Sequence, residues 1–600
     1  MKTSRRTISL LATASLLATA SLFGTGGARA ATAAEAPFDS LPAQTVAVVK
    51  IASLDRFAAG FQELVTSIGP PATMAGPEFS KGLNEAFKIG ADSTAVDRTK
   101  PVYAAVFAIE GQPSEPVAWL VQTSDEAKLR RTVLKASADG DLTTEKRPDG
   151  FEKVMGGAVW YFGRRGDWVV YTQNEEVVKR LTFDAGQQPA LSSLVESRAH
   201  DVLNEGDAAV FVNIAQLIDL YGAKLDEARD KLRRQIQMLP KEFLDNGLNP
   251  EGTKKMYGDA AEVAINAAYD GQWAAGRLSF SASGVSAELL LGVKDETNTS
   301  DLIAAYPPTG FDSLGLLPAG AAVYFGYTPY SETLADWRRD WAKAAYGSDS
   351  PNAQKLLAAI DTLSQAGVTT KVGSLSLPSG LETAMITTAI SQAKDAEKLR
   401  AGENAYQPAA NDLSTPLFTQ STKLQPAAET YQNHSVDLLT TRFDFKDVTD
   451  MGQQIGQKFV QKLFGGNEFQ SRMTTVEGLL VEAGGNDAKY LHELIDGLAS
   501  GEKVLGLDEA YAATRDQLGE QANLVALLNA PKLLVNLLSI VRNIPPYDMF
   551  LAQAPINYGA QPAASYAGVS LGTESRAVRV NLFIPSGQPQ GVLQIFGQGR

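Results

Sequence analysis

The stretch LPAQTVAVVKIASLDRFAAGF, residues 41–61, carries the pattern that decides the fold. Val46 to Ile51 is rich in β-branched residues and predicts a strand, and the proline at position 42 suits a strand entry where no ladder bond is needed. Apolar side chains then recur every three or four residues and predict a helix, at Leu54, Phe57 and Phe61.

The same succession returns in LPAGAAVYFGYTPYSETLADWRRDW, residues 317–341. It predicts a strand at Val323 to Tyr327 and a helix carrying Leu334, Trp337 and Trp341. A pattern this long, repeated at a large spacing, indicates an internal repeat.

Four further blocks recur in the same order, at offsets between 270 and 316 residues. Each pairs a strand with a helix or with a second strand. They are Val117–Arg130 with Ala384–Arg400, Gly166–Leu181 with Gly478–Leu498, Val210–Ile218 with Ala526–Leu534, and Gly276–Val293 with Gly568–Ile584.

We therefore predict a duplicated α+β protein, with residues 31–300 as the first repeat and 315–600 as the second. The many short strands and tight turns favour mostly antiparallel sheets with helices packed on one face. The alternative is the ordinary alternation of strands and helices in any mixed protein. Two segments differ between the halves: Glu403–Gln432, which its turn-forming prolines predict to be an extended loop, and Leu225–Met238, a charged, solvated helix.

Residues 1–30 match a secretory signal peptide, with a retained membrane helix as the alternative. Lys2, Arg5 and Arg6 precede an apolar run, and Ala28-Arg29-Ala30 fits the cleavage rule, so the mature chain is expected to begin at Ala31. Ser4 to Ile8 also resembles a twin-arginine export signal. We expect an exported protein, periplasmic or extracellular, with no stable membrane span once the signal is removed.

Charge and cysteine content exclude several classes of function. The chain has 54 basic and 68 acidic residues, and losing the four basic residues of the signal leaves the mature chain with a net charge of −18. Such a surface repels phosphate backbones, which argues against nucleic-acid binding, and disfavours attachment to anionic lipid. The chain has no cysteine, so it has no disulfide, thiol nucleophile or thiolate metal site.

Motifs for chemistry are sparse. The three histidines, His200, His434 and His492, lack metal-ligand spacing, so we predict no metal site, no cofactor and no catalytic residue identifiable from sequence. Ser391 and Lys394 form an SxxK, which in serine acyl enzymes puts both side chains on one helical face, but no companion motif accompanies it. Arg165-Gly166-Asp167 fits a hairpin turn better than an adhesion motif.

The most apolar stretch of the mature chain is Leu524–Val541. Pro531 suits a first helical turn, and the following residues predict one broad apolar face that is either core or a partner surface. Its members are Leu533, Leu534, Leu537, Leu538 and Val541.

The Leu-Pro-Ala, strand and helix pattern of Leu41–Phe61 and Leu317–Trp341, placed after a signal, resembles a family of large exported bacterial proteins whose domain has no known function. The resemblance implies location and no site. We expect a non-catalytic binding or structural module of the cell envelope, its ligand being an envelope protein or a small molecule. The alternative is a hydrolase whose carboxylates are brought together by folding, because such pairs leave no spacing in the sequence.

Overall fold

The computed structural model describes residues 37–89, 93–109, 116–135, 142–156, 158–182, 189–239, 249–329, 332–347, 350–377, 385–410, 413–415, 417–500 and 504–597. The expected signal peptide and its cleavage site lie outside these residues. The chain divides into two compact units. Unit 1 comprises Met1–Leu225, Tyr269–Thr297 and Arg576–Ser586, and unit 2 comprises Asp226–Ala268, Asn298–Ser575 and Gly587–Arg600.

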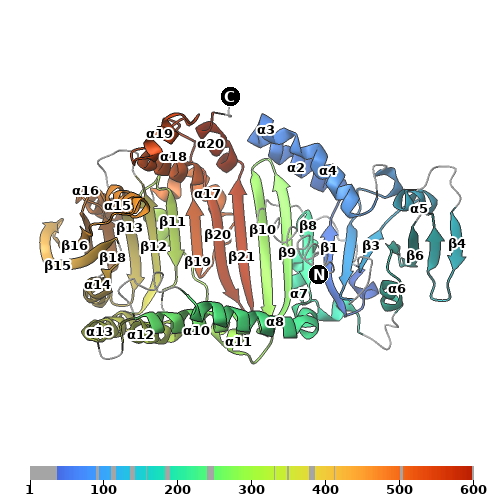
Figure 1. The fold of residues 1–600 in the computed structure, drawn as a ribbon, viewed down its shortest axis with the longest axis horizontal. Helices are drawn as coiled ribbons and strands as arrows, with labels where there is room; N and C mark the ends of the chain where they lie inside the picture. The colour runs from blue at the N-terminus through green and yellow to red at the C-terminus, as the bar shows by residue number, and fades with distance from the viewer. Residues whose placement is uncertain are drawn as a thin grey trace. The chain divides into compact units, whose positions relative to one another are not determined.

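Unit 1 is built on an antiparallel sheet whose strands pair in the order β4-β5-β6-β7-β3-β2-β1-β8-β9-β10-β21 (Figure 1). The strands are β1 (Thr45–Ile51), β2 (Val102–Phe107), β3 (Val117–Val121), β4 (Thr143–Lys146), β5 (Glu152–Met155), β6 (Val159–Arg165), β7 (Trp168–Thr172), β8 (Ala208–Val212), β9 (Gly271–Ser281), β10 (Gly284–Val293) and β21 (Ala577–Pro585). Its helices include α2 (Leu54–Ile68), α3 (Pro70–Thr73), α4 (Ala75–Ala86), α5 (Glu126–Leu134), α6 (Glu175–Leu181) and α7 (Ser197–Asn204).

The opening strand and helix of unit 1 form where the sequence predicts them. The side chain of Ser53 accepts a hydrogen bond from the Arg56 N–H and caps α2, and the helix ends at Gly69, whose φ of 122° favours glycine. The three apolar positions of the helix differ in burial: Leu54 and Phe57 are buried, whereas Phe61 is half-buried.

Helices cover both faces of the sheet of unit 1, so the expectation of helices on one face is wrong for this unit. Successive residues of a strand point to opposite faces. On β9, Phe280 stacks on Phe57 of α2 with ring centroids 5.2 Å apart. Arg277, of opposite parity, pairs with Glu205 at the end of α7. Because both strand faces are apolar in the middle of the sheet, each needs its own helical layer.

The strands of unit 2 also pair antiparallel, in the order β14-β15-β16-β17-β18-β13-β12-β11-β19-β20 (Figure 1). The strands are β11 (Val323–Tyr327), β12 (Val368–Ser376), β13 (Ile386–Ala393), β14 (Leu413–Ser414), β15 (Phe418–Tyr431), β16 (His434–Phe445), β17 (Glu468–Val476), β18 (Leu479–Gly484), β19 (Leu524–Leu528) and β20 (Ala567–Glu574). Its helices include α11 (Asn298–Ala304), α12 (Glu332–Tyr346), α13 (Pro351–Ala366), α14 (Ala396–Ala410), α15 (Met451–Phe464), α16 (Lys489–Ser500), α17 (Glu509–Arg515), α18 (Ala530–Val541), α19 (Tyr547–Ala552) and α20 (Gly587–Ile595).

The strands of the two units are connected in the same order. In unit 1 the first strand, β1, lies between β2 and β8, and in unit 2 the strand β11 lies between β12 and β19. The mixed α+β class and the antiparallel pairing agree with the prediction. The duplication itself stays a prediction.

The segment Glu403–Gln432 was expected to be an extended loop, and that expectation is wrong for its described residues. It contains the end of α14, with Pro408 inside the helix, and the strand β15. The register of β15 with β16 shifts between Gln425 and Glu429, so Pro426 falls in an irregularity where its missing N–H removes no ladder bond. The charged segment Leu225–Met238 is helical as predicted up to Gln237, where α8 (Ile214–Gln237) ends, and is largely exposed.

Among the residues that the structure describes, no helix combines the length and the apolar composition needed to cross a bilayer.

Candidate functional site

The apolar face predicted within Leu524–Val541 lies on α18. Asn529 caps this helix by accepting from the Lys532 N–H, and Pro531 occupies its first turn. The fully buried residues of α18 are Pro531, Val535 and Asn536. All five residues of the predicted face are instead half-buried: Leu533, Leu534, Leu537, Leu538 and Val541.

Three further helices lie near α18 in unit 2. Helix α15 and helix α20 both contact α18, and α19 follows it in the chain (Figure 1). We call α15, α18, α19 and α20 the helical layer. All fourteen residues of α15 are described and none is buried. Large apolar side chains of α15 and α19 stand in solvent: Met451 is 66% exposed, Met549 64% and Phe550 70%.

A mostly buried ion cluster lies elsewhere in unit 2, between the strands and α14. The Lys371 Nζ on β12 is 2.7 Å from the Glu482 Oε2 on β18 and 3.9 Å from the Glu403 Oε1 on α14. Burial alone would lower the pKa of Lys371, but the two carboxylates raise it above its ordinary value. Burial raises the pKa of Glu403, against the opposing effect of Lys371. The cluster thus offers a buried ion pair beside a carboxyl group that favours its protonated form.

The SxxK motif does not form the geometry of a serine acyl enzyme. Ser391 is a strand residue of β13, in register with Lys371 of β12, and Lys394 follows the end of that strand. Two side chains three apart on a strand point to opposite faces, whereas the motif requires one helical face.

Other buried carboxylates are held by cations. In unit 1, Glu288 of β10 is 3% exposed and pairs with Arg277 of β9 and with Arg579 of β21. In unit 2, the Asp437 Oδ2 on β16 accepts from the Arg400 Nε and the Asn404 Nδ2, both 2.6 Å away on α14.

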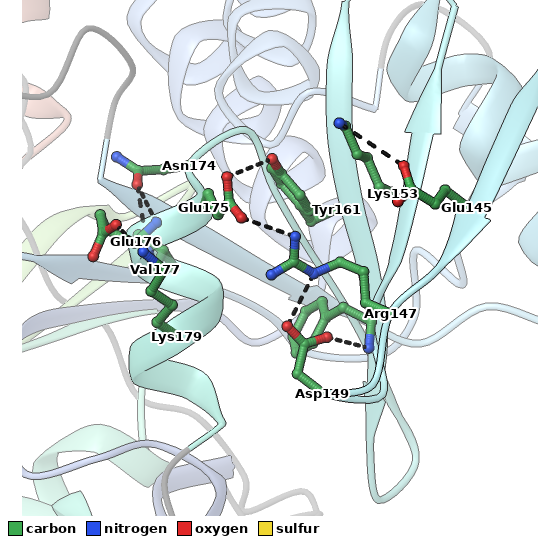
Figure 2. Close-up of polar contacts among 11 residues, drawn as sticks. Glu145, Arg147, Asp149, Lys153, Tyr161, Asn174, Glu175, Glu176, Val177 and Lys179 are labelled. Atoms are coloured by element: carbon green, nitrogen blue, oxygen red, sulfur yellow. Dashed lines mark hydrogen bonds and ion pairs between the residues drawn. The ribbon is translucent and has the colours of Figure 1, made fainter.

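A partly exposed polar cluster in unit 1 surrounds Arg147 (Figure 2). Its guanidinium donates to Asp149 and to Glu175, each at 2.9 Å, and lies over the ring of Tyr161. The hydrogen bond from Arg147 lowers the pKa of Glu175, and burial raises the pKa of Tyr161. Because these contacts tie the turn after β4 to the start of α6, their geometry fits a structural connection.

Lys50 is a buried amine in unit 1. It is 7% exposed, lies between Tyr103 of β2 and Ala209 of β8 in the sheet, and donates from Nζ to the Leu203 carbonyl at 2.8 Å. Burial, and secondarily the charge of Arg56, lowers the pKa of Lys50 to about 8.

The three histidines occupy separate places. The ring of His200 on α7 packs edge-on against Phe38, and His434 begins β16. His492 on α16 stacks on Tyr431 with ring centroids 3.8 Å apart, and its Nε2 is 3.3 Å from the Glu429 Oε1. Within the described residues, no group of three or more His, Asp or Glu is placed to hold a metal ion.

Sequence analysis did not identify the clusters of Lys371, Glu288, Asp437 and Lys50. Lys371, Glu288 and Lys50 each lie inside a strand whose other residues are apolar or neutral, and Asp437 lies next to the apolar pair Leu438-Leu439 of β16; that was the signal available. A charge at a buried strand position needs a partner, but the partner comes from another strand or helix whose pairing the sequence does not reveal.

No protein-family model and no curated protein matches this chain. Two solved structures align with part of it, crystal forms III and IV of TP0453. They are 12% and 11% identical, cover 45% of this chain and 86% and 84% of those chains, and give TM-scores of 0.19 and 0.20. Scores this low carry no argument about fold or function.

Proposed function

We propose that this chain is a non-catalytic protein of the bacterial cell envelope, exported and acting as a binding or structural module. The observation that carries the proposal is the helical layer, in which α15 has no buried residue and the apolar face of α18 is half-buried. Exposed apolar surface of this kind is characteristic of sites that bind a partner.

The buried charges support a non-catalytic role. Glu288, Asp437 and Glu482 each contact at least one Arg or Lys, so their charges are neutralised inside the fold. Such pairs connect strands and helices that are distant in sequence, and breaking one leaves an uncompensated buried charge.

The second candidate is a carboxylate-dependent hydrolase. Glu403 and Glu482 flank the same ammonium group, and burial raises the pKa of Glu403, as a general acid requires. A pair of carboxyl groups in different environments is the arrangement used in glycoside hydrolysis.

Fractionation and an activity screen together test both candidates. The proposal expects the native chain in the periplasmic, extracellular or envelope fraction, and no turnover of chromogenic glycosides or esters by the purified mature chain. Recovery in the cytoplasm would contradict the envelope role. Turnover that disappears in Glu403→Gln and in Glu482→Gln, while both variants stay folded by circular dichroism, would establish the hydrolase instead.

A further inference from the structure

We infer that the helical layer of unit 2 is a docking surface for the surface of an anionic phospholipid bilayer. The inference rests on the proposed function and specifies its partner. It starts from α15 and α19, whose exposed side chains Met451, Met549 and Phe550 are large and apolar. Tyr547, also on α19, is 42% exposed. An aromatic ring with a polar hydroxyl suits the boundary between lipid headgroups and acyl chains.

Charge distribution selects lipid over other apolar partners. The whole chain carries a net charge of −14, yet the helical layer together with its capping residues Asp450 and Arg542 carries four basic residues and two acidic ones, a net charge of +2. The basic residues are Lys458, Lys462, Lys532 and Arg542, and the acidic residues are Asp450 and Asp548. Amphipathic helices with cations beside apolar side chains bind in the plane of an anionic interface.

The cations are not equivalent. Lys532 donates to the Gly320 carbonyl, and burial lowers its pKa, so its contribution is the smallest. Lys458 is exposed and Lys462 half-exposed on α15, and Arg542 is exposed, with its guanidinium 4.5 Å from the ring centroid of Tyr558. Asp450, just before α15, is engaged as the cap of that helix, where it accepts from the Gln453 N–H.

The layer also differs from the corresponding part of unit 1. Strands β16 and β17 are joined through α15, whereas β5 and β6, which hold the same places in the pairing order of unit 1, are joined by residues 156–158. The connection that carries two of the four cations and the exposed Met451 is therefore an addition specific to unit 2.

The net negative charge of the whole chain disfavours attachment to anionic lipid, but the helical layer itself carries a net positive charge. At physiological salt the Debye length is about 8 Å, so the charges close to the bound face affect membrane binding more than the net charge of the whole chain.

Vesicle sedimentation with the mature full chain tests the inference. We expect co-sedimentation with phosphatidylglycerol vesicles, weakening with added salt, and much less with phosphatidylcholine vesicles. Because each cation near an anionic surface contributes about 1 kcal/mol, the double variant Lys458→Gln with Lys462→Gln should bind roughly 30-fold more weakly. Met549→Ser with Phe550→Ser should abolish binding to either vesicle.

Two matched variants serve as controls. Lys81→Gln with Lys146→Gln removes the same charge from exposed positions of unit 1, and Met74→Ser removes a methionine that is 81% exposed there. Both should bind as the unaltered chain does. Equal losses of binding in the test and control variants, or no binding to anionic vesicles, would overturn the inference. So would a chain that does not bind vesicles but forms a dimer by light scattering, if Met549→Ser with Phe550→Ser abolishes that dimer. Failure of vesicle binding by a chain found in the envelope fraction would refute this inference alone, whereas a cytoplasmic chain would refute the proposed function.

Discussion

Lys50 gives the sharpest quantitative prediction, through the variant Lys50→Met. The pKa of this amine falls from 10.5 to about 8 in the folded chain. Each pKa unit corresponds to about 1.36 kcal/mol, so keeping Lys50 charged in the fold costs about 3 kcal/mol at pH 7. Methionine fills a similar volume without a charge, although the variant gives up the hydrogen bond to Leu203, which contributes about 1 kcal/mol.

The sign of the pH dependence follows from proton binding. Between pH 8 and 10.5 the unfolded chain retains a proton on Lys50 that the folded chain has released, so the free energy of unfolding due to this group rises with pH. Lys50→Met should be more stable than the unaltered chain at pH 7 by about 2 kcal/mol. This advantage should shrink as pH rises and reverse near pH 10.5, for a total change of about 3 kcal/mol.

Chemical denaturation followed by tryptophan fluorescence measures this difference. Four of the six tryptophans lie in unit 1, the unit that contains Lys50: Trp119, Trp160, Trp168 and Trp273. Lys81→Met is the control, since it makes the same replacement at an exposed position of α4. A difference between Lys50→Met and the unaltered chain that is constant from pH 7 to 10.5 would refute the reasoning, as would a large loss of stability at pH 7.

Four further predictions follow from specific contacts. Glu482→Gln should destabilise unit 2 by about 3 kcal/mol in urea unfolding because it leaves Lys371 poorly paired. The double variant Lys371→Met with Glu482→Met should recover much of that loss. A Glu482→Gln variant as stable as the unaltered chain would contradict a charged pair. Glu262 on α10 (Pro250–Asp270) has a pKa lowered to about 2 by hydrogen bonds from Arg229 and Arg233, so its stabilisation is present above about pH 4.5 and is lost as pH falls toward 2. Melting curves of Glu262→Gln and the unaltered chain should therefore converge in acid, and a gap that stays constant to pH 2 argues against the pairing. Gly252→Ala should lower the free energy of unfolding by about 1–3 kcal/mol because the new Cβ would overlap the Ala344 backbone. Gly258→Ala on the same helix places its Cβ where no atom lies within 4 Å, so it should raise the stability. The reverse order of stabilities would show that α10 does not pack on α12. The mature chain purified from its host should begin within a few residues of Ala31 by N-terminal sequencing, and an intact Met1 would refute cleavage.

Local patterns predicted the individual elements well. The strand at Thr45–Ile51 and the helix at Leu54–Ile68 follow from the β-branched run and from the spacing of apolar residues. Long-range pairing decided the rest. Strand β15 continues past the irregularity at Pro426 because β16 pairs with the residues on both sides of it, and that partner is not visible in the local sequence.

The candidate site was predictable only in part. The apolar periodicity of α18 was apparent in the sequence, but its half-burial depends on α15 and α20, which are distant in the chain. The buried clusters were not predictable, because Lys371, Glu403 and Glu482 come from three elements whose contact requires the sheet order. A short sequence motif specifies residues that are neighbours on one element, and none of these clusters is of that kind.

The common strand order bears directly on where function should be sought. In register, Ala47 pairs with Val212 and Val323 pairs with Leu528, so the two central strands and their neighbours correspond at offsets of 276 and 316 residues. If the halves descend from one unit, which superposition of Leu41–Asn298 on Leu317–Phe596 tests, the larger offset reflects residues added to the connections of the second half, and α15 is one of those additions. An added helix without a buried residue contributes little to the core, so its apolar side is better explained by a partner than by stability.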